Sequence, residues 1–348
     1  MRAYAVQVHI HGPGSEGSAS MRAHDAMAAR SGDIDAVWWT EHDWRLANYF
    51  KVTRFDFDRE EETALFPPRV PENGLPMKEA RMTWCCESPD GDPPGCSVGL
   101  TDKRGYDGQS SLRIQARTDE SGPRSCSRLF WTYNCRDRMP LFSHPRIQLA
   151  VYPEGGFAKG EVFVECVLSQ QPPELRQAGI RYVIGSFRGE DETIDLEPLV
   201  RVSLEAPTDR WTLLDLNPAE DAARLGLPAA GLDNSLHALR IGVTAHSGDA
   251  AACFDALKIT PTERGSVLLQ AQRELVESLP MKVRHFVGAE FSWYGQHVGA
   301  FGGSVPIPDY DTVAPASLAT AGIVDYIHRH RGVACFNHPP PNNIADLA

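Results

Sequence analysis

The sequence lacks any run of 18 uninterrupted apolar residues, and its start, MRAYAVQVHIHG, has neither the longer apolar stretch nor the cleavage site of a signal peptide. We therefore expect no membrane-spanning helix and predict a cytoplasmic protein, with export of a longer form left open. Basic residues are also scarce: 34 Lys and Arg stand against 46 Asp and Glu, a formal net charge of −12. A surface of that sign repels a phosphate backbone, so nucleic acid is not an expected partner.

The eight cysteines contain no CxxC pair, which argues against a zinc ribbon or a thioredoxin-type motif. Seven of them lie between residues 85 and 253. We expect them to be small buried side chains in a reducing compartment. In an exported protein, one or two disulfides within this region are the alternative.

The chain is long enough, at 348 residues, for two domains. Residues 1–54 show a strand–helix–strand pattern, and residues 263–348 return to alternating strands and helices. Between them, residues 55–262 contain short alternating segments separated by Pro, Gly and Asp, which is typical of an antiparallel β-sandwich of jelly-roll type. We predict one α/β domain interrupted by an inserted sandwich.

Ionisable residues stand where the predicted strands of the first segment end. His9 and His11 are two apart, so both side chains project from one face of a strand. The loop that follows carries Glu16, and His42 ends the next strand. Imidazole nitrogens and carboxylate oxygens suit zinc, manganese or iron, and α/β folds place their sites at this edge.

The segments HIHGPGSEG and TEHD resemble the first two motifs of the PHP (polymerase and histidinol phosphatase) family, HxHTxxSDG and TDHD. The register is the same, although Gly12, Glu16 and Glu41 depart from the family pattern. After the insertion, VGAE, QHVGAFG and FNHP resemble later strand ends of the family. The family's final Asp-x-His motif does not appear, so we expect a fragment of a longer protein with weak or no activity.

This resemblance implies a partial, distorted (β/α)7 barrel and a metal-dependent hydrolase in which a metal-activated water cleaves a phosphoester of a small molecule. It implies two or three divalent ions of zinc, manganese or iron. Arg45 is expected at the rim, where it would bind an anionic group of the substrate. The implied metal ligands are His9, His11, Glu16, His42, Glu290, His297 and His338.

Two alternatives remain. The same site would also suit a carbamate or carboxylic ester hydrolase. In a different class of function, the sandwich binds carbohydrate and the α/β part is a degenerate scaffold, which a row of exposed aromatic side chains on one sheet face would favour. Core packing is expected for most of the candidate aromatics, which are Trp84, Trp131, Tyr133 and Trp211.

Overall fold

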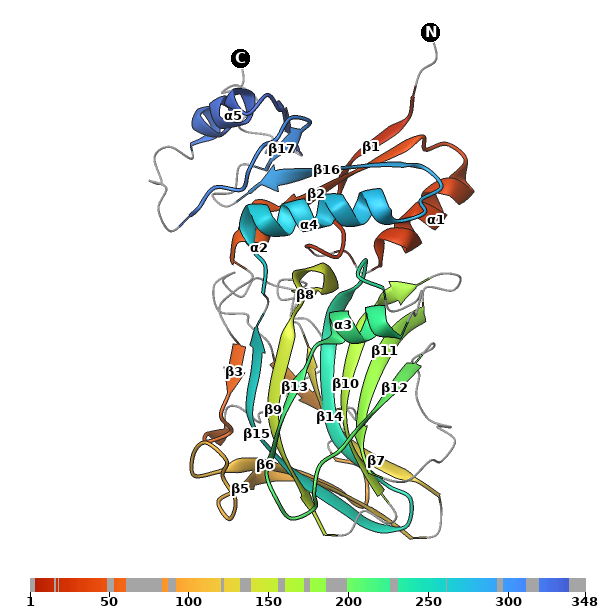
Figure 1. Ribbon diagram of the computed structural model, residues 1–348, viewed down its shortest axis with the longest axis vertical. Helices are drawn as coiled ribbons and strands as arrows, with labels where there is room; N and C mark the ends of the chain where they lie inside the picture. The colour runs from red at the N-terminus through yellow and green to blue at the C-terminus, as the bar shows by residue number, and fades with distance from the viewer. Residues whose placement is uncertain are drawn as a thin grey trace.

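The computed structural model describes most of the chain and divides it into a small α/β layer and a large β-sandwich (Figure 1). The described residues are 4–15, 17, 19–48, 53–60, 83–86, 92–119, 122–131, 139–155, 160–171, 176–185, 199–225, 231–260, 262–292, 297–310 and 319–337. Among them, no helix is long and apolar enough to cross a bilayer.

A five-stranded mixed sheet forms the α/β layer from both ends of the chain, in the order β1-β2-β16-β17-β18. The pairs β1/β2 and β2/β16 are parallel, whereas β16/β17 and β17/β18 are antiparallel. Figure 1 shows α4 lying across this sheet. The elements are β1 (Val6–Ile10), α1 (Met21–Ser31), β2 (Ala36–His42), α2 (Asp43–Asn48), α4 (Gly265–Ser278), β16 (Arg284–Phe291), β17 (Val298–Phe301), α5 (Thr320–Arg329) and β18 (Val333–Phe336).

The predicted partial (β/α)7 barrel is wrong, because a barrel of that kind needs parallel neighbouring strands and the last two strands of this sheet run antiparallel to theirs. Only residues 292–297 separate β16 from β17. A parallel pair needs a crossover of a dozen or more residues. Because this connection is much shorter, the two strands must run antiparallel. Among the described residues the sheet is open, with β1 and β18 as its edge strands.

Local sequence signals explain how the first strand–helix–strand unit forms. Ser20 caps α1 by accepting a hydrogen bond from the Ala23 N–H at 3.1 Å. Gly32 ends the helix in a left-handed conformation with a φ of 71°. Strand β2 lies between two neighbours and is almost entirely buried, and Trp39 within it is 0% exposed in the core beneath α4.

The sandwich consists of a seven-stranded sheet, β12-β11-β10-β14-β7-β4 with β8 beside β14, and a six-stranded sheet, β13-β9-β15-β6-β5 with β3 beside β15. Its described pairs are antiparallel except β11/β12. The strands are β3 (Thr53–Phe55), β4 (Thr83–Cys86), β5 (Cys96–Thr101), β6 (Ser111–Thr118), β7 (Arg124–Trp131), β8 (Met139–Pro140), β9 (Arg146–Glu154), β10 (Gly160–Gln171), β11 (Arg176–Ile184), β12 (Leu199–Leu204), β13 (Thr212–Leu216), β14 (Ser235–Ala245) and β15 (Gly248–Thr260), with helix α3 (Pro218–Arg224).

The inner faces of the two sandwich sheets share one hydrophobic core, to which β9, β10, β14 and β15 contribute alternate residues. A charged contact connects the sandwich to the α/β layer. Arg22 of α1 donates two side-chain hydrogen bonds to the carboxylate of Asp233, which is 0% exposed and precedes β14. The Arg22 backbone N–H donates a further one at 3.1 Å.

Candidate functional sites

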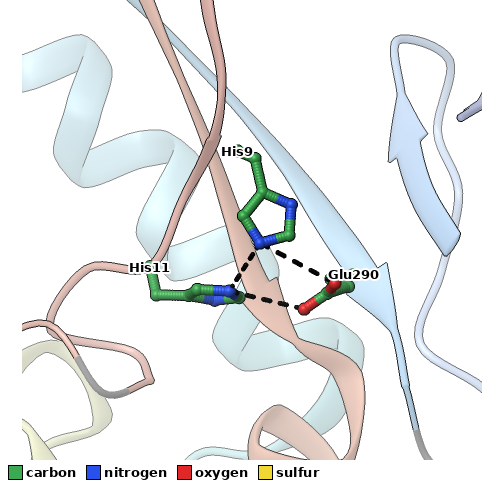
Figure 2. Close-up of side chains that lie close together, drawn as sticks. All are labelled: His9, His11 and Glu290. Carbon is green, nitrogen blue, oxygen red and sulfur yellow. Dashed lines mark hydrogen bonds and ion pairs between the residues drawn. The ribbon is translucent and has the colours of Figure 1, made fainter. Parts of the chain in front are cut away.

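The first candidate site is a cluster of histidines around one buried carboxylate at an edge of the five-stranded sheet. His9 of β1 and His11 just after it have their Nε2 atoms 2.9 Å apart. Figure 2 shows both imidazoles directed toward Glu290, which stands near the end of β16. The two Nε2 atoms lie 3.8 Å and 3.4 Å from the Glu290 carboxylate oxygens.

Strand register completes this cluster. In the parallel pair of β2 and β16, Glu290 is the partner of His42, and its Oε2 lies 2.8 Å from His42 Nδ1. His297 lies just before β17 and places its Nδ1 3.0 Å from Glu290 Oε1. His297 also has a φ of 50°, a left-handed conformation that is uncommon outside glycine and is found at functional sites.

Two sets of candidate metal ligands share the Glu290 carboxylate. One is His9, His11 and Glu290, and the other is His42, Glu290 and His297. Within each set the ligand atoms lie within 4.8 Å of one another. Ligands at about 2.0–2.2 Å from a cation would need only small side-chain adjustments to converge from such separations. The donor chemistry, imidazole nitrogen with carboxylate oxygen, fits zinc, manganese or iron.

The electrostatics of the cluster keep Glu290 in its charged form. Burial alone would raise the pKa of this carboxyl, but the hydrogen bond and charge of His42, the charge of His11 and a hydrogen bond from Asn337 outweigh it and lower the pKa to about 2. The Asn337 amide donates to Glu290 Oε1 at 3.2 Å. A metal ligand must be deprotonated, and this carboxylate is so at neutral pH.

Further buried groups form hydrogen bonds with His42 and with its neighbour in the chain, Asp43. The Ser292 hydroxyl lies 2.6 Å from His42 Nδ1, and the Ser292 N–H donates to Asp43 Oδ1 at 2.8 Å. The Tyr310 hydroxyl donates to the other oxygen of Asp43. Burial raises the pKa of Asp43 to about 6, although its hydrogen bonds act in the opposite direction. Such outer groups orient ligand histidines in metal sites.

The structure thus brings together five of the seven ligand residues named from sequence: His9, His11, His42, Glu290 and His297. Glu16 and His338 lie outside the described residues. Sequence reasoning missed Ser292 and Asn337. Neither residue has a pattern of its own, although each stands within two residues of a named ligand in the chain.

Glu41 and Arg45 are buried near the cluster but belong to neither of the two ligand sets. The Glu41 carboxylate accepts hydrogen bonds from the Gly12 N–H at 3.1 and 3.0 Å and from the Gln272 amide at 2.9 Å. A Cβ at residue 12 would lie 2.8 Å from this carboxylate, which explains the glycine there. Arg45 is 5% exposed in α2 and its guanidinium packs over the Trp44 ring, so its contact with a substrate stays a prediction.

The second candidate site is the outer face of the six-stranded sheet. Register puts Arg113, Cys253 and Tyr152 in one row across β6, β15 and β9, and Gln115, Ala251 and Glu154 in the next. Arg113 donates to both oxygens of Glu154, and Arg104 donates to the same carboxylate at 2.7 Å. These charged residues line a pocket of about 300 Å³ together with Thr101 and Lys103.

Three aromatic rings stand beside these charged residues. The Trp211 ring centroid lies 5.6 Å from that of Tyr106 and 5.5 Å from that of Tyr152. The Arg104 guanidinium packs over Tyr152 at 4.6 Å, which connects the rings to the charged pocket. Tyr106 is 43% exposed. Trp211 was one of the aromatic candidates in the sequence. Of the others, Tyr133 and the side chains of Trp84 and Trp131 lie outside the described part of the chain.

Comparisons with known proteins find no protein-family model and no curated protein that matches the chain. Similar solved structures include several carbohydrate-binding modules. The C-terminal family 22 module of Clostridium thermocellum Xyn10B is 13% identical with a TM-score of 0.30, and the match covers 62% of this chain and 95% of that one. A family 11 module of the C. thermocellum cellulase Lic26A-Cel5E is 8% identical with a TM-score of 0.30, covering 61% and 95%. A family 30 module is 13% identical with a TM-score of 0.30, covering 48% and 75%.

The prediction of PHP-family membership is wrong, because no family model matches the chain and the sheet lacks the parallel barrel that the resemblance implied. The prediction of a metal-dependent hydrolase rested on that membership and is corrected with it. The resemblance rested on short strand-end motifs, and an open sheet can carry such motifs as readily as a barrel. Hydrolysis was implied by the resemblance alone. The histidine and glutamate cluster itself is an observation of the structure and is independent of that family.

Proposed function

We propose that this protein binds carbohydrate on the outer face of the six-stranded sheet. The observation that carries the proposal is the group of three aromatic rings, Tyr106, Tyr152 and Trp211, beside the pocket formed around Glu154. Sugar rings have apolar C–H faces and polar hydroxyl edges. Aromatic surface with a few convergent polar groups is the combination that binds such a ligand.

The polar part of this surface suits hydroxyl groups. Glu154 offers acceptor oxygens, and the two arginines that hold it have five N–H donors each, of which the bonds to Glu154 occupy only some. A vicinal pair of hydroxyls can donate to the carboxylate and accept from a guanidinium at once. The ion pairs also fix these side chains before a ligand arrives, which reduces the entropy lost on binding.

Binding to soluble polysaccharides tests this proposal directly. Affinity gel electrophoresis against xylan, glucomannan and mixed-linkage β-glucan should show retardation by at least one of them. Trp211→Ala should weaken that binding by about 10-fold or more, equivalent to ~1.4 kcal/mol. Tyr4→Ala is the matched control, because Tyr4 is also aromatic and 59% exposed but lies before β1. Equal retardation of wild type and Trp211→Ala would refute the location.

We further propose that the cluster around Glu290 binds divalent metal ions, up to one in each of the two ligand sets. The specific observation is the convergence of four imidazoles on one ionised carboxylate that is 0% exposed. His9 belongs to one set alone and His297 to the other, so single variants distinguish them. No catalytic step is proposed for the metal.

Equilibrium dialysis with Zn²⁺, Mn²⁺ or Fe²⁺, followed by elemental analysis, measures the stoichiometry. If two ions bind, His9→Gln and His297→Gln should each remove one, and the double variant should remove both. Protein that binds none of these ions at micromolar concentration would refute the metal site, whatever the result with polysaccharides.

A further inference from the structure

The two sheets of the sandwich approach each other closely where β5 and β7 begin, and each strand brings a cysteine to this place. Cys96 is the first residue of β5 in the six-stranded sheet, and Cys126 is the third residue of β7 in the seven-stranded sheet. The strands do not pair with each other, so contact between these cysteines is contact between sheets.

The thiols face one another. Cys96 Sγ lies 3.4 Å from the carbonyl oxygen of Ser125, next to Cys126, and Cys126 Sγ lies 3.9 Å from the carbonyl oxygen of Ser97, next to Cys96. Each sulfur is thus directed at the backbone beside the other cysteine, and Cys96 packs against the same buried core that contains Cys126. A disulfide needs Cβ atoms about 3.5–4.5 Å apart and side chains that point toward each other. The side chains of Cys96 and Cys126 do point toward each other.

We propose that Cys96 and Cys126 form a disulfide that joins the two sheets of the sandwich when the protein meets a thiol-oxidising environment. The two residues are 30 positions apart in the chain, so the bond closes a loop long enough to restrict the unfolded chain. The two side chains already converge in the folded state, so the bond would join neighbouring groups.

The surroundings of the two thiols indicate the order of the reaction. Cys126 is 2% exposed, and burial together with the neighbouring Cys96 raises the pKa of its thiol. Cys96 is only partly buried, so it is the sulfur that an external reagent reaches first.

Exchange with a small disulfide such as oxidised glutathione supplies the oxidant. The Cys96 thiolate attacks one sulfur of that disulfide, forms a mixed disulfide and releases one thiolate. The Cys126 thiolate then attacks the Cys96 sulfur and releases the second. The two cysteines lose two electrons and two protons, and the small disulfide is reduced to two thiols.

Incubation of the whole protein with oxidised and reduced glutathione at a series of ratios, followed by alkylation and peptide mapping, tests the proposal. We expect a crosslinked peptide pair containing Cys96 and Cys126 in oxidising buffer. We also expect a melting temperature roughly 5–10 °C higher than in reducing buffer. Cys96→Ser and Cys126→Ser should each abolish that difference.

Cys335→Ser is the matched control, because Cys335 is exposed on β18 in the other layer and its loss should leave the difference intact. The mapping uses the wild-type chain, so the test holds even if a buried variant folds poorly. Recovery of both Cys96 and Cys126 in alkylated form from the most oxidising buffer, or of either one bonded to a different cysteine, would overturn the proposal.

Discussion

Glu290→Gln separates metal binding from simple packing in the histidine cluster. The carboxylate lies within 3.0 Å of both His42 and His297 and within 3.8 Å of both His9 and His11, so it belongs to both ligand sets. An amide of the same shape keeps the volume but removes the negative charge and replaces one acceptor oxygen by a donor.

The magnitude follows from what the carboxylate contacts. Loss of an outer-shell partner of a metal ligand typically lowers metal affinity 10- to 100-fold. Because Glu290 would be a direct ligand in both sets, we expect at least the upper end, about 100-fold or ~2.7 kcal/mol. In the metal-free protein the lost charge-assisted hydrogen bond to His42, at 2.8 Å, should cost about 1.5–3 kcal/mol, partly offset by relief of a buried charge.

Isothermal titration calorimetry with Zn²⁺ and thermal unfolding with and without metal measure these two effects. Glu41→Gln is the matched control, because Glu41 is also 0% exposed and hydrogen-bonded but belongs to neither ligand set. It should lose stability and keep its metal affinity. The reasoning is refuted if Glu290→Gln binds Zn²⁺ within a few-fold of wild type, or if Glu41→Gln loses as much affinity as Glu290→Gln.

Three further predictions test other parts of the structure. Gly12→Ala should lower the free energy of unfolding by about 1–3 kcal/mol in chemical denaturation, because the new Cβ would lie 2.8 Å from the Glu41 carboxylate; unchanged stability would contradict that close approach. Asp233→Ala should cost about 3–5 kcal/mol, because it removes a buried carboxylate and leaves the Arg22 charge without it; an effect under ~1 kcal/mol would show that the layers do not depend on this pair. Carbohydrate binding should be constant from about pH 5 upward and fall only in more acidic solution. Burial raises the pKa of Glu154, but the hydrogen bonds and charge of its arginine partner Arg113 outweigh this and hold the pKa below its ordinary value. The ionised network is therefore complete above the ordinary glutamate pKa of about 4.3 and is lost as the pH falls through the lowered pKa. Binding that titrates near pH 6 would contradict this assignment.

Several local features of the fold could be read from residues alone. Ser20 and Gly32 delimit α1 as capping rules require, and the alternation in residues such as SLRIQART predicts the sandwich strands. The direction of β17 could also have been deduced, since the connection from β16 is too short for a parallel crossover. The resemblance to PHP motifs instead implied parallel neighbours, and hence a barrel that the chain does not form.

The aromatic surface, in contrast, could not be read from local sequence. Trp211 was a candidate in the sequence, but Tyr106 and Tyr152 were not, because nothing in their local sequence distinguishes a surface tyrosine from a core one. Their grouping depends on a loop after β5, a central strand and the residue before β13 meeting on one sheet face. Cross-strand register decides that, and register is a property of the whole sheet.

By itself, then, the sequence determined which residues stand at strand ends: His9, His11 and His42 follow from alternation and strand length, which are local. Only the tertiary structure decided that Glu290, 248 positions after His42, is its partner across β2 and β16 and is held by four imidazoles. The physical reason is that a strand's neighbours are chosen by long-range burial and backbone pairing. A short motif carries no information about either.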